Sequence, residues 1–455
     1  MGRPFPKLGL AAVVAVGLLA PVARAETLTD ALIAAYKHSN LLEQNRALLR
    51  VADEDVAVAV AGLRPVINFI ASAGYNEPRP LSDNYTAGIA LTADITLYDS
   101  GSTRLGIDAA KETVLAAREA LLQFEQNVLL TAVGAYMEVI RASNFVRISE
   151  NNVRLITQEL RAARDRFAVG EVTRTDVAIA EARLAAANSL LAARQGEFNL
   201  AREAYKAAVG RYPGQLVRPK TPPMTARTVE DAKAVAVRNH PLIRRDQRDV
   251  TVAELNILRA RAAMKPTVTG SLSTSIDQDR ATANSVGVRL TQPIYQGGRL
   301  SALLRQAIAL ADAERAALLQ TVLTVKQEVG NAWSNLAVAI ARSQADARQV
   351  QASQVAYRGV REEATLGART TLDVLNAEQE LLDARAALIQ AETQQFVAVY
   401  SLLASMGLLT VEHLQLGIVT YDPAAYYNAV KNAPTRYVSP QGEKLDRIIK
   451  SLGRD

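Results

Sequence analysis

Hydrophobic and polar residues alternate with a period of two in four stretches of the chain. The first two stretches span about residues 65–76 and 86–98, and the other two span about residues 266–277 and 284–295. In the second stretch, for example, apolar side chains occupy the odd positions from Ile89 onward, with polar residues between them. This alternation predicts β-strands with one apolar and one polar face, and the short gap inside each pair predicts two hairpins.

Apolar residues recur every three or four positions in the segments that flank these pairs. This spacing predicts long helices over residues 102–167 and 299–364, and shorter helices over 176–209 and 372–406. A further helix is predicted before each strand pair, over about residues 26–63 in the first case. At the rise of an α-helix, the first long helix would extend about 97 Å. Two shorter helices placed end to end would match it in length.

The same order of elements occurs twice, because the chain contains two similar copies of one unit. Residues 228–407 repeat residues 26–210, with an offset of 201 before the strands and 197 after them. Residues 211–227 contain four prolines and are predicted to be a linker. Residues 408–455 form a tail outside the repeat, which either packs on the helices as a belt, with a short helix near its end, or is loose.

The first 25 residues have the layout of a secretory signal peptide. Basic residues precede an apolar run over residues 8–20, which is followed by the small residues Ala23 and Ala25. We therefore expect the protein to be exported and the mature chain to begin near Glu26. No later segment offers about 18 consecutive apolar residues, so we expect no membrane-spanning helix. If the chain crosses a membrane, it does so with strands.

Composition excludes several classes of function. The chain has no Cys, which excludes disulfides and thiolate metal sites. Three of its 52 basic residues precede Glu26, and the others nearly balance 46 acidic residues, so no nucleic-acid partner is indicated. The nucleotide-binding and hydrolase motifs are absent, and the three His residues lack metal-ligand spacing. We expect no enzymatic activity, no metal and no cofactor.

Four strands per chain cannot close a barrel, and an open sheet in lipid would leave backbone groups without partners. Several chains must then share one barrel. Two chains would give a side-chain-filled interior, whereas three would give twelve strands and an aqueous lumen, which suits the polar faces better. Asp94 and Arg289 would face this pore, and the apolar faces would contact lipid. The alternative is a soluble periplasmic coiled-coil scaffold or adaptor protein, in which protein core covers one face of the strands.

Short motifs flank the strands of both copies. The sequences "GLRPVI" and "AMKPTV" precede the first strand of each copy, and "LYDSG" and "IYQGG" follow the second. Together with the tandem copies, these motifs make residues 27–410 similar to the TolC family of outer-membrane efflux and secretion channels. The resemblance implies a homotrimer with a twelve-stranded outer-membrane barrel and a helical barrel in the periplasm. It also implies a periplasmic adaptor (membrane fusion) protein and an inner-membrane transporter, of the ABC or proton-driven type, as partners.

The turn after each long helix carries the same residues in both copies. Gly170 and Gly367 are placed to end the helices in the left-handed conformation. Each is followed by the T-x-x-D spacing of a capping box, which ends at Asp176 or Asp373. An Ala-Glu pair follows in both copies. Helix capping alone accounts for this motif.

Position adds a second role to these turns. Three chains would place six such Asp residues around one opening, and carboxylate rings select cations. The resemblance implies that Arg369 and Asp373 help to hold the periplasmic entrance shut. Ala364 replaces a family Tyr and Asn376 replaces a family Asp, so we expect fewer bonds and fewer charges in this gate. The candidate constriction residues are Thr175, Asp176, Arg369, Asp373 and Asn376.

Overall fold

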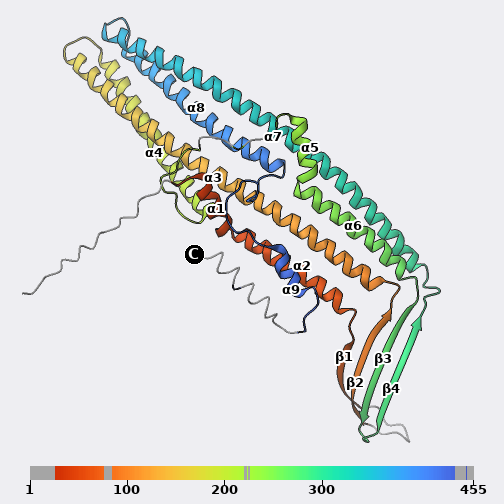
Figure 1. Ribbon diagram of the computed structural model, residues 1–455. Helices are drawn as coiled ribbons and strands as arrows, with labels where there is room; N and C mark the ends of the chain where they lie inside the picture. The colour runs from red at the N-terminus through yellow and green to blue at the C-terminus, as the bar shows by residue number, and fades with distance from the viewer. Residues whose placement is uncertain (1–25, 76–84, 220–222, 224–225, 436–446, 448–455) are drawn as a thin grey trace, which may run out of the picture.

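The computed structural model of the chain describes residues 26–75, 85–219, 223, 226–435 and 447. The predicted signal peptide lies outside these residues, as does almost all of the segment in which a final short helix was expected. The described chain is elongated, with its strands at one end and two helix-to-helix turns at the other (Figure 1). None of its described helices combines the length and hydrophobicity that a bilayer-spanning helix requires.

The strands form one antiparallel sheet in the order β1-β2-β3-β4. Their bounds are β1 Val66–Tyr75, β2 Tyr85–Tyr98, β3 Thr267–Asp277 and β4 Thr282–Thr291. The expected extension of the last strand to residue 295 is wrong, because β4 ends at Thr291. Pro293 follows two residues later and has no backbone N–H to donate to a strand ladder.

The strand register gives the sheet one polar and one apolar face. Asp94 is paired with Ser271, and Arg289 is paired with Thr269, whose other partner is Thr96. Since Thr96 and Asp94 are two residues apart, Asp94 and Arg289 lie on the same face. The opposite face is exposed in the single chain and carries the apolar side chains of Ile67, Phe69, Leu91, Leu272, Val286 and Val288.

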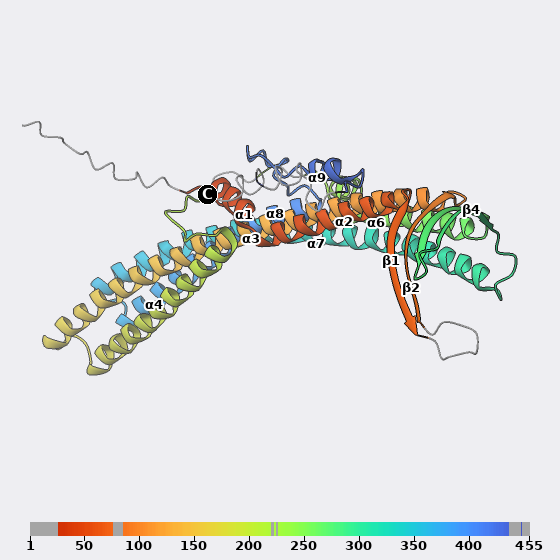
Figure 2. The ribbon, with the colours of Figure 1, turned by 90° about the horizontal axis from the view of Figure 1, so that it is seen from below.

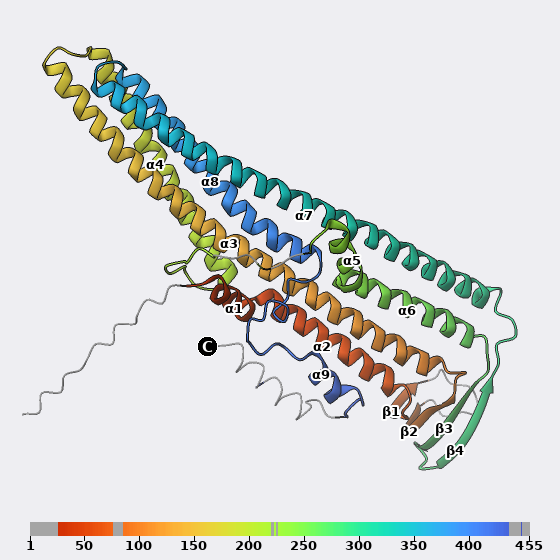
Figure 3. The same ribbon diagram turned by 45° about the horizontal axis from the view of Figure 1, so that its top comes forward.

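The helices of the described chain lie side by side along its length (Figure 3). The first copy contains α1 Leu28–His38, α2 Asn40–Ala61, α3 Ser102–Ala168 and α4 Arg174–Val209. The second copy contains α5 Val229–Asn239, α6 Pro241–Ala262, α7 Arg299–Thr365 and α8 Thr371–Ser405. The long helix α3 packs along α4, α2 and α6, while α7 packs along α8, α6 and α5.

The expectation of one helix over residues 26–63 is wrong, because the helix is broken at Ser39. This residue has extended backbone angles, and its side chain accepts a hydrogen bond from the amide of Leu42. The second copy is broken at the equivalent residue, His240, directly before Pro241. Apolar periodicity continues across both breaks and therefore does not reveal them.

The core lies in the middle of the molecule, where both copies contribute helices. The backbone carbonyl of Glu26 accepts a hydrogen bond from the Tyr136 hydroxyl at 3.0 Å, and its carboxylate accepts one from the Tyr205 hydroxyl at 2.7 Å. These bonds fasten the start of the described chain to α3 and α4. Other residues buried in this core are Leu42, Leu129, Met137, Leu403 and Leu409.

The described part of the tail packs on the helices as a belt. It contains the short helix α9, Pro423–Val430, which lies against α2 on one side of the helical layer (Figure 2). The Tyr426 hydroxyl donates to Glu54 of α2 at 2.8 Å, and the Arg118 guanidinium lies 5.5 Å from the ring centre of Tyr427. Of the two alternatives, the packed tail is therefore observed for these residues.

Candidate gate at the helical tip

The two repeated turns lie together at the end of the molecule remote from the sheet (Figures 1 and 3). One turn joins α3 to α4, and the other joins α7 to α8. A hydrogen bond crosses between the copies here, from Arg183 of α4 to the side-chain oxygen of Asn376 on α8, at 3.1 Å. The predicted gate residues of both copies therefore lie close together at one end of the folded molecule.

Gly170 and Gly367 end the long helices in the same way. Their φ angles are 82° and 79°, in the left-handed region that favours glycine. A Cβ atom added to either glycine would meet no atom within 4 Å, so the requirement is conformational rather than steric. The backbone amide of the residue after each glycine donates to a backbone carbonyl of the preceding helix. Glu171 donates to Arg166 and Ala368 donates to Glu363, both at 2.9 Å.

Each turn then starts the next helix with a complete capping box. In the first copy, the Asp176 carboxylate accepts from the Thr173 amide at 2.9 Å and from its hydroxyl at 2.7 Å. In the second copy, the corresponding bonds from Thr370 to Asp373 measure 3.0 and 2.8 Å. These bonds hold the pKa of both carboxyl groups below the usual value for Asp. Both turns therefore keep an ionised acid at neutral pH.

Arg369 is bound inside its own turn. Its Nε donates to the Glu363 carboxylate at 2.9 Å, and both side chains are about half exposed, at 51% and 52%. The hydrogen bond with Glu363 raises the pKa of Arg369, with a smaller electrostatic contribution from Asp373. Sequence reasoning missed Glu363, although an acid on the last turn of a helix is a visible partner for an Arg that follows the helix-ending glycine.

The remaining predicted residues of the tip have different surroundings. Thr175 is exposed on the first turn of α4. Asn376 is exposed and is the residue that Arg183 binds across the two copies. Ala364, at the position of the family Tyr, is buried and packs with Tyr357 of the same helix. The link from Arg183 was not predicted, because its two ends belong to different copies.

Asp94 and Arg289 lie at the opposite end of the molecule from these turns. They share the polar face of the sheet, as its register requires. The structure does not bring them together with the tip residues into one site. The chain thus carries two separate groups of predicted functional residues, one on the strands and one at the helical tip.

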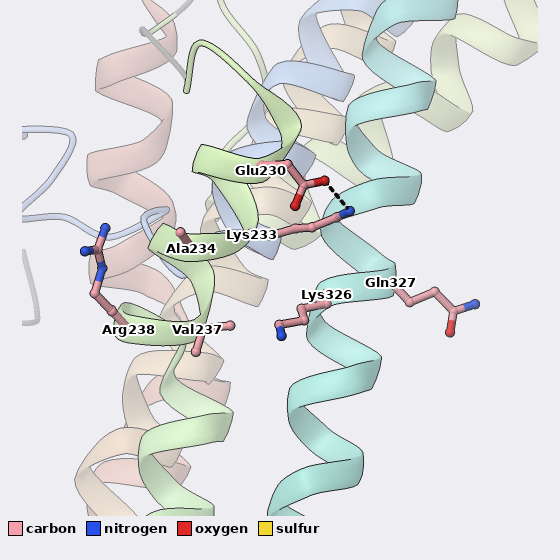
Figure 4. A pocket seen from close by; sticks show the side chains of 7 residues that line it. All are labelled: Glu230, Lys233, Ala234, Val237, Arg238, Lys326 and Gln327. Atoms are coloured by element: carbon pink, nitrogen blue, oxygen red, sulfur yellow. Dashed lines mark hydrogen bonds and ion pairs between the residues drawn. The ribbon is translucent and has the colours of Figure 1, made fainter.

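A groove between α5 and α7 is a further surface feature (Figure 4). It is open to solvent, and Lys233 in it donates to Glu230 at 3.0 Å. The other lining residues are Ala234, Val237, Arg238, Lys326 and Gln327. Within the described residues, no group of three or more His, Cys, Asp or Glu side chains is placed to hold a metal ion.

Known proteins resemble the chain in sequence and in fold. Residues 32–211 and 234–408 match the sequence model of the family described as outer membrane efflux protein. The outer membrane efflux protein BepC of Brucella suis is 36% identical over 436 residues, which are 93% of this chain and 95% of BepC. The outer membrane protein TolC of Vibrio cholerae is 27% identical over 421 residues, which are 87% of this chain and 94% of that protein.

The fold also resembles that of a solved outer-membrane channel. The crystal structure of the Campylobacter jejuni CmeC outer membrane channel superposes with a TM-score of 0.75 at 14% identity, and covers 96% of this chain and 98% of CmeC. At this identity the likeness concerns the fold alone. The family match includes both copies of the repeat, and the similarity to BepC extends over nearly the whole chain. The chain therefore belongs to the outer membrane efflux protein family, whose members are outer-membrane channels.

Proposed function

We propose that three copies of this chain form one exit duct, which passes molecules from a periplasmic adaptor and an inner-membrane transporter to the cell exterior. The observation that carries the proposal is the two-faced sheet. Its order leaves β1 and β4 as open edges, and one of its faces is apolar and exposed in the single chain. In a bilayer both edges need hydrogen-bond partners, which neighbouring copies would supply by pairing β1 with β4.

A barrel of three such sheets would have twelve strands, with the apolar faces toward lipid and the polar faces toward water. Asp94 and Arg289 would then lie in the lumen. The soluble scaffold alternative requires protein to cover the apolar face, and in the described chain this face is exposed. Family membership also favours the channel over the scaffold.

The turns at the helical tip would form the periplasmic entrance. Three chains would gather six capping-box carboxylates there, from Asp176 and Asp373, and give the closed entrance a preference for cations. Arg369 would stabilise the closed form by holding each α7–α8 turn in place through Glu363. Thr175 and Asn376 would line the same constriction.

Small molecules are the first candidate for the transported substrate, because BepC, at 36% identity, is named as an efflux protein. Secreted polypeptides are the second candidate. The protein performs no chemical step in either case, and the transporter would supply the energy.

Deletion of the gene from its host tests both candidates. We expect the deletion strain to accumulate a fluorescent efflux dye and the wild-type gene to restore its removal. Proteins in the culture medium are measured in parallel, and loss of a secreted polypeptide without a change in dye would identify secretion as the main function. If neither quantity changes although the restored protein is found in the outer membrane, the exit-duct proposal is contradicted.

A further inference from the structure

The two helical hairpins differ in one pair of residues that the repeat makes equivalent. In the first copy, Arg164 of α3 donates to Glu181 of α4 at 2.6 Å. The offset of 197 residues aligns these two with Arg361 of α7 and Glu378 of α8. In the second copy, Arg361 instead has its Nε 3.8 Å from Glu159 of α3. Within the described chain, neither carboxylate oxygen of Glu378 has a hydrogen-bond partner.

Glu378 is also buried, whereas its equivalent in the first copy is half exposed. Only 4% of Glu378 is accessible to solvent, and its helix, α8, packs against both α7 and α3. Burial and, to a smaller extent, the nearby Glu159 raise its pKa to about 7, against the opposing effect of Arg361. The Glu378 carboxyl therefore changes its charge near neutral pH.

Few charged groups surround this carboxyl. From α7 it is approached by Tyr357, whose hydroxyl is buried and also lacks a partner in the described residues, and by Arg361. From α3 it is approached by Glu159. Two further cations of the region are already engaged: Arg385 of α8 is bound to Gln354, and Arg183 of α4 is bound to Asn376.

Arg361 thus interacts with two carboxylates, with Glu159 at 3.8 Å and electrostatically with Glu378. While Glu378 is protonated, it is neutral and stays buried at low cost, and Arg361 joins α7 to the other copy through Glu159. When Glu378 ionises, a buried charge without a partner is costly, and Arg361 is a cation that favours the ionised form. The pair between Arg164 and Glu181 shows that an Arg at this position reaches the Glu of its own hairpin.

We propose that Arg361 is a proton-controlled link between the two repeats: it binds Glu159 while Glu378 is protonated and moves to Glu378 when that carboxyl ionises, which releases α7 from α3 at the tip. The link would regulate the entrance, and in that respect the inference rests on the proposed channel function. A carboxyl whose pKa is raised in the folded state stabilises that state most when the pH is below its ordinary pKa of 4.5. The closed packing is therefore tightest in acid and weakens as the pH rises through about 7.

Hydrogen exchange of peptides from α3 and α7 around Glu159 and Arg361 tests the link without requiring a pore. Between pH 6 and pH 8, the ionised fraction of a group with a pKa near 7 rises by about tenfold. After correction for intrinsic exchange rates, we expect wild-type protection factors to fall by up to about tenfold over this range. Glu378→Gln keeps the side-chain volume and should hold protection high at both pH values, whereas Arg361→Gln should leave it low at both.

Glu181→Gln is the matched control, since it removes the equivalent acid of the first copy and should leave the pH dependence unchanged. The proposal is overturned if Glu378→Gln retains the wild-type pH dependence, or if Glu181→Gln abolishes it. Conductance measured over the same pH range separates the two proposals. A normal exchange response in a protein that forms no pore would uphold the link and contradict the channel.

Discussion

Ser39 and His240 are equivalent residues of the two copies, and they cap their helices with different chemical groups. The Ser39 hydroxyl accepts a hydrogen bond from the Leu42 amide at 3.2 Å, and the Nδ1 atom of His240 accepts one from the Leu242 amide at 3.3 Å. His240 is only 3% exposed, and burial lowers its pKa to about 4. A protonated Nδ1 cannot accept this bond, so only the second copy carries an acid-sensitive break.

Replacing His240 with Ser should remove this acid sensitivity. The pKa of His240 is lower in the folded state than its usual value of 6.5, so its contribution to stability is present above pH 6.5 and is lost as the pH falls toward 4. The loss amounts to about 2 kcal/mol by pH 5. In thermal melts of detergent-solubilised protein, His240→Ser should lose less stability than wild type between pH 7.5 and pH 5. His413→Ser, at an exposed position, should follow wild type. Equal pH dependence in His240→Ser and wild type would refute this assignment.

Substitutions in the capping boxes can remove the negative charge of the tip without removing the helix caps, or remove the caps without changing the charge. In Asp176→Asn/Asp373→Asn, an amide oxygen can still accept the threonine hydrogen bonds, but two negative charges per chain are lost. We expect cation preference in bilayer recordings to fall, with little change in melting temperature. Thr173→Ala/Thr370→Ala should keep the cation preference but lower the melting temperature, because each lost cap costs about 1 kcal/mol of stability. If the Asn variant keeps full cation preference, these acids do not set selectivity.

Arginine substitutions of two neighbouring residues on opposite faces of β4 should affect assembly in the outer membrane differently. Val286 is 83% exposed on the apolar face, whereas Ser285 lies on the polar face and is hydrogen-bonded to Ser273 at 2.8 Å. Val286→Arg would place a charge toward lipid, at a cost of about 2–4 kcal/mol near the middle of a bilayer. We expect less assembled protein in the outer-membrane fraction for Val286→Arg than for Ser285→Arg. Equal amounts of the two variants would mean that lipid does not face Val286.

Local patterns predicted much of this fold. Since side chains alternate strictly along a strand, the sequence alone placed Asp94 and Arg289 on polar faces, and the register puts them on one face of the sheet. The T-x-x-D spacing predicted the capping boxes, because their hydrogen bonds join residues three positions apart. Pro293 was a visible signal for the end of β4 that the alternating pattern obscured.

Contacts that depend on the path of the chain were not predictable in this way. The link from Arg361 to Glu159 joins helices of different copies, and the repeat by itself predicts a different partner, Glu378. The most informative residues of the tip are therefore those at which the two copies depart from their symmetry.

Single-channel conductance in a planar bilayer tests the central claim, that the chain forms a channel closed at the repeated turns. We expect the purified wild-type trimer to show a small, cation-preferring conductance that increases in Arg369→Ser. Arg174→Ser removes an exposed Arg from the turn of the first copy and should leave the conductance small. Folded trimeric protein that forms no pore would contradict the channel itself. A pore already open in wild type and unchanged by Arg369→Ser would contradict the gate.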